Sequence, residues 1–389
     1  MSGFSVGWDA GPSSQIEVFS PDPQTQAGGY RLKFTPPFRS TLRPPQRPLQ
    51  LTPNKLEFFR KGLSDLFVAA GARGVNAAAA PTGDEIIKKT KNYGGQLLDS
   101  VVPQSVQDVL RARDLYLEIG VDEPLIEFPW ELLHDGTEYL CLKHRVARFV
   151  NLSQETIPRG ALPDPWTEGP LSILIISVPI PQQRERRPPF EMLTSVQKET
   201  EAILAVIDSL GDAAKKTVLS GPQATSAAVW EAITQGDRYH IVHYSGHAYF
   251  NIEQPTSSSL CLFDEDMEAG DILNYFGKKP PVLSFMNGCE TAAMPGGAAA
   301  TKNRYDIFSL ARAFLDTGSY LIGNRWKVGD QAAAAFADTF YRKLLLEGQP
   351  LGQVIRDARK DCKTQMPDYD FSWASYIFYG DPRLCFRRL

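Results

Sequence analysis

The sequence predicts an α/β fold, with a layered and mostly parallel sheet that has helices on both faces. Beyond about residue 84, short apolar segments of strand length alternate with segments of helical spacing, a pattern typical of such sheets. The longest apolar run, residues 171–180, has half of the ~20 residues that a bilayer span needs, so it indicates a buried strand. The composition, 43% hydrophobic and 22% charged with a mean hydropathy of −0.25, argues against disordered, collagen-like and membrane-spanning chains.

The first 83 residues form a region of their own in this prediction. Residues 16–20 and 30–34 alternate apolar and polar side chains around a turn rich in proline and glycine, which indicates a β-hairpin. Residues 56–70 predict one amphipathic helix. Residues 71–83 contain glycines and a proline without a periodic apolar face, so they indicate a linker.

The rest of the chain predicts two successive halves, residues 84–190 and 191–389. Short apolar segments within them predict strands at residues 114–119, 171–178, 217–220, 239–244, 281–286 and 319–326. Helical spacing predicts one helix that ends before Gly211, a second over residues 307–315, and a third that begins at Asp330 and ends near Gly348. Three irregular segments, residues 179–191, 250–259 and 292–305, predict surface loops, which tend to carry function.

The net charge and the cysteines limit which partners the protein can bind and in which cellular compartment we expect it. The formal charge is −4, from 41 Lys and Arg against 45 Asp and Glu, so we expect neither a nucleic-acid nor a membrane partner. The five cysteines are odd in number and widely spaced, which argues against a disulfide framework and a zinc knuckle. The amino end resembles no secretory signal, and we expect a cytoplasmic protein.

Cofactor and metal sites find little support in the sequence. Neither GxGxxG nor GxxxxGK[ST] follows a strand, which lowers the rank of nucleotide chemistry. Three of the five histidines, His240, His243 and His247, fall in one segment. Because side chains alternate along a strand, His240 and His243 should face opposite ways, while His247 should lie beyond the strand end in a glycine turn. We therefore expect no metal and no organic cofactor, and leave dependence on calcium open.

Two neighbouring predicted strands end in small-residue turns that carry reactive side chains, His247 and Cys289. In open α/β sheets, sites lie beyond the carboxyl ends of strands. If the two strands are adjacent and parallel, the turns deliver a thiol and an imidazole to one edge of the sheet. An imidazole favours the thiolate and later protonates a leaving amine, so the pair indicates a nucleophile and its base.

Six motifs then occur in a recognisable order. They are PWELLHDG (residues 129–136), HYSGHA (243–248), SFMNGCETA (284–292), GNRWKVGD (323–330), FYRKLL (340–345) and YGDPRL (379–384). Together they resemble the CHAT family of caspase-like cysteine peptidases, relatives of separase, caspases and gingipains. The resemblance covers roughly residues 90–389 and implies a pseudo-caspase half followed by a catalytic half, with His247 and Cys289 as the catalytic dyad.

One position departs from the family pattern. The residue after the catalytic histidine is usually glycine, and here it is Ala248. The resemblance implies an oxyanion hole formed by the backbone N–H groups of Ala248 and Cys289. Alanine still donates an N–H if the backbone angle tolerates a Cβ atom.

Other residues have both a functional and a structural interpretation. His243 and His240 are expected to be packed histidines, although His243 could act as a catalyst. Cys141, near His134 and His144, could mimic a second dyad, but we favour structural packing. For substrate binding, Asp330 is either a carboxylate that pairs with a basic P1 side chain or a helix N-cap. Glu290 and Trp326 line the pocket or serve as scaffold and core.

The sequence therefore predicts a cytosolic cysteine endopeptidase that cleaves a protein substrate. The resemblance suggests bacterial defence or regulated cell death, and latency until a sensor protein or an upstream protease acts. Two exposed basic loops are candidate activation cuts, at Arg186 and Arg187 and at Lys302 and Arg304. The alternative is a weak or inactive caspase-like scaffold that binds protein partners, and Ala248 keeps this alternative open.

Overall fold

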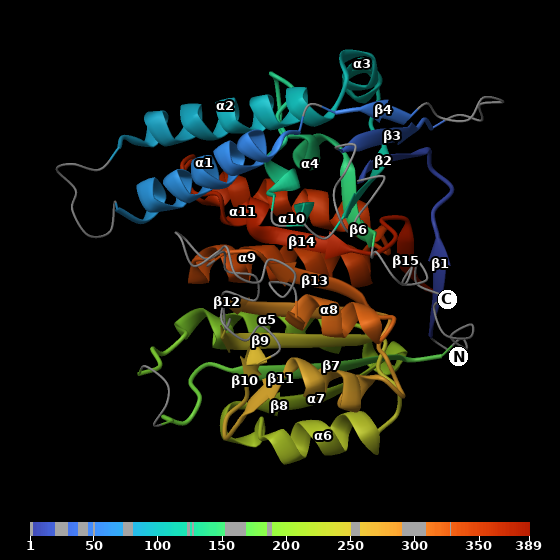
Figure 1. The fold of residues 1–389 in the computed structure, drawn as a ribbon. Helices are drawn as coiled ribbons and strands as arrows, with labels where there is room; N and C mark the ends of the chain where they lie inside the picture. Colours follow the sequence, from blue (N-terminus) through green and yellow to red (C-terminus); the bar gives the residue numbers. More distant parts are fainter. Residues whose placement is uncertain are drawn as a thin grey trace.

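The fold is organised around one large mixed sheet (Figure 1). The computed structural model describes residues 3–19, 30–37, 46–49, 51–72, 81–122, 125–126, 128–151, 169–184, 189–249, 257–289, 309–326 and 328–389. Thirteen strands in these ranges form the sheet, in the order β11-β10-β9-β12-β13-β14-β6-β5-β2-β3-β4, with β7 and β8 extending from β9. Most neighbouring pairs are parallel. The predicted α/β class is therefore confirmed.

The carboxyl-terminal part of the sheet consists of five parallel strands. They are, in spatial order, β8 (Ala214–Ser220), β7 (Leu171–Val178), β9 (Ile241–Tyr249), β12 (Leu283–Cys289) and β13 (Tyr320–Asn324). Alternate residues of these strands enter two separate apolar clusters, with Ile173 and Ile241 in one and Leu174 and Val242 in the other. Both faces of β7, β9, β12 and β13 are largely buried, as parallel sheets require, whereas the edge strand β8 has no fully buried residue.

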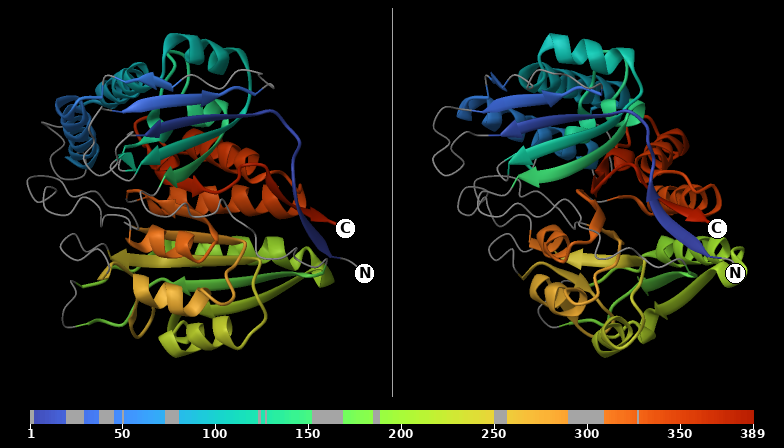
Figure 2. Two further views of the ribbon diagram at one scale, coloured as in Figure 1. Left: turned by 45° about the vertical axis from the view of Figure 1, so that its right-hand side comes forward. Right: turned by 90° about the vertical axis from the view of Figure 1, so that its right-hand side faces the viewer.

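Helices supply the partner for each buried face. The cluster with Ile241 also holds residues of α5 (Thr194–Asp208), α9 (Asp330–Tyr341) and α10 (Leu351–Gln365). The cluster with Val242 holds residues of α6 (Ser226–Thr234), α7 (Ala269–Phe276) and α8 (Ser309–Asp316). The two helix sets thus lie on opposite faces of the sheet (Figure 2). A π-helical turn, Arg342–Leu346, extends α9 toward Gly348, whose φ of 61° ends the helix.

The amino-terminal part of the sheet is joined to the rest through β14 (Tyr376–Tyr379), which pairs with β13 and β6. Its other strands are β6 (Arg145–Asn151), β5 (Tyr116–Asp122), β2 (Ser13–Phe19), β3 (Arg31–Thr35) and β4 (Gln46–Pro48). β2 and β3 form the predicted antiparallel hairpin. The helices of this part are α1 (Pro53–Ala72), α2 (Gly83–Val101), α3 (Gln104–Ala112) and α4 (Leu140–Lys143), with α11 (Ser372–Ser375) preceding β14.

Short strands complete the architecture. β10 (Ser259–Cys261) and β11 (Asp266–Glu268) form a hairpin beside the end of β9. β1 (Phe4–Trp8) pairs with β15 (Leu384–Arg388) in a separate ribbon, so that both ends of the chain lie side by side (Figure 2). β7 precedes residue 190, where the sequence places a boundary, and pairs with β8 and β9. No helix within the described ranges is long and apolar enough to cross a bilayer.

Two strands run further than the sequence predicts. β9 continues to Tyr249 and β12 to Cys289, so the turns expected at residues 245–247 and 287–289 are wrong. Gly246 explains the first error. A Cβ atom there would lie 2.7 Å from the Tyr244 hydroxyl and 3.0 Å from the Val178 carbonyl oxygen. Gly246 therefore allows close packing within the sheet and does not make a turn.

Candidate functional site

His247 and Cys289 lie on adjacent parallel strands at the same level of the sheet. The register of β9 and β12 pairs residue 241 with residue 283 and continues in step until the Cα atom of His247 pairs with that of Cys289. The adjacency that the sequence analysis required is therefore present. The strands bring the two residues together even though they are far apart in the sequence.

The imidazole of His247 is oriented by a backbone carbonyl. His247 is half-buried, and its Nε2 lies 2.8 Å from the carbonyl oxygen of Glu191. A carbonyl oxygen can only accept, so Nε2 carries the proton in this contact. In the neutral ring, Nδ1 is then the nitrogen that can take a proton from a thiol.

The loop after β7 holds that carbonyl in place. Its two ends are joined where the Leu193 N–H donates to the Pro179 carbonyl, at 2.9 Å. The Phe190 ring lies 5.2 Å from the His247 ring and 5.7 Å from the Arg184 guanidinium. Arg184 donates to the carbonyl oxygens of Leu262 (2.5 Å) and Glu265 (2.9 Å) and pairs with Asp266. The β10–β11 hairpin thus anchors, through Arg184, the loop that contacts the histidine.

A cluster of buried polar side chains lies on the α5 side of the same strands. We call it the buried polar cluster, and it consists of His243, Glu199, Ser245, Asn287 and Asn324, each at most 6% exposed. The Glu199 carboxylate accepts hydrogen bonds from Ser245 (2.7 Å) and Asn287 (2.6 Å). His243 Nε2 lies 3.0 Å from Glu199 Oε1. The sequence analysis missed Glu199, although its position three residues after Val196 and four before Ile203 places it within the apolar stripe of α5.

The histidines do not converge as a metal site would require. No group of metal-ligating side chains is found within the described ranges. His240 lies just before the start of β9, at the end of this strand opposite to His247. Its Nδ1 accepts from the Ser172 N–H (2.9 Å), and burial lowers its pKa to about 4. His243 and His247 occupy alternate positions of one continuous strand, so the prediction that His247 lies in a turn beyond the strand is wrong.

The predicted substrate-binding residues are described only in part. Trp326 is half-buried and packs against the core, and its backbone N–H donates to the Ser375 hydroxyl (3.0 Å). Asp330 is the first residue of α9, and the N-cap is Gly329, so the interpretation of Asp330 as the cap is wrong. Ala248 lies within β9 as the register partner of Leu260 in β10. Glu290 and the candidate cleavage residues Arg186, Arg187, Lys302 and Arg304 lie outside the described residues.

The amino-terminal part holds a second cysteine with histidines nearby, and there they serve structure. Cys141 lies on α4, and its thiol donates to the Glu131 carbonyl (3.0 Å). Burial raises the pKa of Cys141 to about 12. His134 Nδ1 accepts from the Gly136 N–H (3.0 Å), and burial lowers the pKa of His134. The expectation of structural packing fits this geometry.

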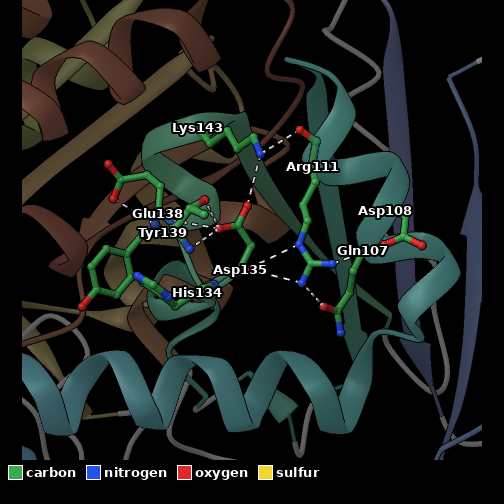
Figure 3. Close-up of polar contacts among 10 residues, drawn as sticks. Gln107, Asp108, Arg111, His134, Asp135, Glu138, Tyr139 and Lys143 are labelled. Atoms are coloured by element: carbon green, nitrogen blue, oxygen red, sulfur yellow. Dashed lines mark hydrogen bonds and ion pairs between the residues drawn. The ribbon is translucent and has the colours of Figure 1, made fainter.

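Asp135 fixes the turn that carries His134 (Figure 3). Its carboxylate accepts from the N–H and hydroxyl of Thr137 and from the Glu138 N–H, and lies 3.1 Å from the Lys143 ammonium. Burial would raise the pKa of Asp135, but these hydrogen bonds outweigh it and hold the pKa well below its usual range. Arg111 donates to the Asp135 carbonyl. The polar side chains of this turn therefore form hydrogen bonds within the fold.

One family model and several solved structures are similar to this chain. A model of the CHAT domain family matches residues 91–381. No curated protein matches the sequence. Among solved structures, the Arg specific cysteine proteinase gingipain R is similar with a TM-score of 0.48 and 12% identity, over 75% of this chain and 71% of that chain. The complex of Porphyromonas gingivalis RgpB pro- and mature domains gives a TM-score of 0.46 and 11% identity, over 85% and 78% of the two chains.

Proposed function

Because this chain belongs to the CHAT domain family, we propose that it is a caspase-like cysteine endopeptidase that cleaves a protein substrate through Cys289 and His247. The observation that carries the proposal is the register pairing of these two residues on adjacent parallel strands. The carbonyl of Glu191, which orients the His247 ring, supports the assignment of His247 as the base.

The proposed reaction proceeds through a thioester. The Cys289 thiol gives its proton to His247, and the thiolate attacks the carbonyl carbon of the scissile peptide bond. The N–H groups of Ala248 and Cys289 would hold the oxyanion. The carbon–nitrogen bond then breaks as His247 returns the proton to the leaving amine. Water, activated by His247, hydrolyses the thioester and regenerates the thiol.

The substrate pocket and the regulation belong to the same proposal. Asp330 would pair with a basic P1 side chain, with Trp326 and Glu290 as further walls. Latency would end when a sensor protein acts or when a protease cuts at Arg186, Arg187, Lys302 or Arg304. We place this activity in bacterial defence or regulated cell death in the cytoplasm, on the strength of the motif resemblance.

Mass spectrometry of a proteome-derived peptide library tests the proposal directly. Wild-type protein and Cys289→Ala are incubated with the library, and new peptide termini are scored. We expect cuts after Arg or Lys with wild type that has first been activated by a limited protease cut at the candidate activation residues, the protease then being removed, and no cuts with Cys289→Ala treated in the same way. Small or apolar residues before the cuts would contradict the Asp330 pocket, and cuts shared by both proteins would contradict the role of Cys289.

The second candidate function is a scaffold that binds a peptide without cleaving it. Ala248, where the family usually has glycine, is the feature that favours it. An electrophilic peptide probe separates the two functions. Labelling of wild type that is lost in Cys289→Ala supports the peptidase, whereas binding of the same peptide without labelling supports the scaffold.

A further inference from the structure

The buried polar cluster lies next to the proposed dyad, two residues earlier along β9 and β12. Its centre is the carboxylate of Glu199. One carboxylate oxygen accepts from Asn287 on β12 (2.6 Å) and the other from Ser245 on β9 (2.7 Å). Ser245 and Asn287 are register partners, and the pair two residues further along the same strands is His247 and Cys289. Glu199 therefore connects the two strands two residues before His247 and Cys289.

The same hydrogen bonds continue across the sheet. The side-chain carbonyl of Asn287 accepts from Asn324 Nδ2 (2.8 Å), at the end of β13, and from the Tyr376 hydroxyl (3.2 Å), at the start of β14. Four neighbouring strands are thus connected to helix α5 through side chains on one face. The amide of Asn287 is held from both sides and cannot rotate without losing a bond.

The environment of Glu199 argues against a role in stability alone. The residue is 1% exposed, and its titratable neighbours are His243, at 3.0 Å, and Tyr341, whose pKa is raised by burial and by the Glu199 charge. Burying an ionic group is costly, and well-packed apolar side chains often stabilise a fold as well or better. The hydrogen bonds of Glu199 to one residue on each of β9 and β12 are what an apolar side chain of the same size could not supply.

We infer that Glu199 is a positioning residue for the dyad, holding the ends of β9 and β12 in register so that His247 and Cys289 meet. The inference rests on the proposed function, because it requires that these two residues react together. Glu199 bonds Ser245 and Asn287, two residues before His247 and Cys289 on their strands, and would act through them. Displacements of about 1 Å at reacting groups can reduce a rate ~10²-fold.

Alkylation of the Cys289 thiol by iodoacetamide measures this positioning without a substrate. The rate is followed at different pH values by mass spectrometry of the Cys289 peptide. A thiol paired with an imidazole reacts below the pKa of about 8.5 of an isolated cysteine. For Glu199→Met, which keeps the volume but accepts no hydrogen bond, we expect the half-maximal pH to rise toward that value. The rate at pH 6 should fall about 10-fold, as a shift of one pH unit requires.

Two further variants make the result specific. Glu199→Gln still accepts from one strand and should recover part of the low-pH rate. Thr200→Val is the matched control, because Thr200 is also buried on α5 but its hydroxyl bonds Ser177 on β7, which carries neither dyad residue. It should keep the wild-type profile at a comparable loss of thermal stability. If Glu199→Met does not fold, Ser245→Ala removes one of the two bonds and should give a smaller shift in the same direction.

The outcomes separate the inference from the function on which it rests. If the alkylation rate of Cys289 in wild type depends on pH as that of an isolated cysteine does, the proposed dyad is overturned. The positioning role of Glu199 is then overturned as well. If wild type has a low pH of half-maximal alkylation, and Glu199→Met and Ser245→Ala both keep that value, only the role of Glu199 is overturned and the dyad stands. An equal shift in Thr200→Val would show a general effect of buried substitutions in α5 and would also overturn it.

Discussion

The two parts of the sheet both contain a cysteine near histidines, and they use them differently. Cys141 is 1% exposed, its thiol donates to a backbone carbonyl, and burial raises its pKa to about 12. Cys289 ends a parallel strand beside His247, which is half-buried and contacts a loop. A buried thiol in apolar surroundings is inert. A cysteine near a histidine is therefore not enough for a reactive pair. The cysteine must also lie at the carboxyl edge of the sheet, where a substrate can reach it.

The two buried glutamates sharpen the contrast. Glu131 and Glu199 are each 1% exposed. Glu131 faces cations: Arg148 Nε donates to its carboxylate at 2.9 Å, and Arg359 lies 3.9 Å away. Glu199 faces hydroxyl, amide and imidazole groups on the strands of the dyad. The first connects elements that hold the fold together, and the second connects elements that carry the proposed reaction.

The largest expected difference separates the two cysteines. Cys289→Ala should reduce peptide cleavage by at least about 10³-fold, because the nucleophile is lost. Cys141→Ala should leave the cleavage rate within about twofold and lower the free energy of unfolding by ~1 kcal/mol. Cleavage assays and urea unfolding measure the two effects. A large loss of activity in Cys141→Ala at unchanged stability would break the comparison.

The histidines should divide in the same way. His247→Ala should lower the cleavage rate about 10²- to 10⁴-fold through loss of the general base. His134→Ala removes the acceptor of the Gly136 N–H and should cost roughly 1–3 kcal/mol of stability with little change in rate. Cleavage rate constants and thermal melts of both variants distinguish a loss of catalysis from a loss of stability. The division fails if His134→Ala slows cleavage as much as His247→Ala does.

Removing the charge of Glu131 tests the structural role of the amino-terminal part. Glu131→Gln leaves the buried Arg148 guanidinium without its carboxylate and should cost about 3–5 kcal/mol of unfolding free energy. Glu138→Gln is the matched control, because Glu138 is half-buried and lies 3.9 Å from Lys363, so its loss should cost less than ~1 kcal/mol. Neither variant should move the pH profile of Cys289 alkylation, and a shift in Glu131→Gln would connect the two parts.

Both parts of the sheet should also lose stability in acid. His144 and His240, one in each part, are buried, and burial lowers the pKa of each to about 4. Protonation is therefore disfavoured in the folded state, so stability is full above the unfolded pKa of about 6.5 and is lost as the pH falls from there toward 4. Each should contribute on the order of 1–3 kcal/mol of this loss.

Urea unfolding between pH 7 and pH 5 checks the shared effect. His144→Gln and His240→Gln should each flatten the decrease of unfolding free energy by a similar amount. A decrease that stays as steep in both variants as in wild type would assign the acid sensitivity to other groups.

The sequence predicted the elements whose pattern is local. The hairpin of β2 and β3 and the strands of the carboxyl-terminal part follow from short-range periodicity. The proximity of His247 to Cys289 was predicted only on the condition that their strands are adjacent and parallel, which the register of β9 and β12 fulfils. β6 was not predicted, because it contains Arg148, and an arginine is typical of a surface position unless its buried partner Glu131 is known. The partners of Glu199 lie on strands far along the chain, so no local pattern indicates them.

The central place of β14 has a consequence for synthesis. This strand, Tyr376–Tyr379, separates β13 from β6 in the middle of the sheet, yet it follows almost every other element in the chain. During translation, the amino-terminal and carboxyl-terminal strands can each pair among themselves, but β6 and β13 keep unpaired edges until β14 leaves the ribosome. Asn287 also lacks the Tyr376 hydroxyl until then. The nascent chain therefore cannot complete the hydrogen bonds around the proposed dyad before β14 has been synthesised, which delays any peptidase activity until that point.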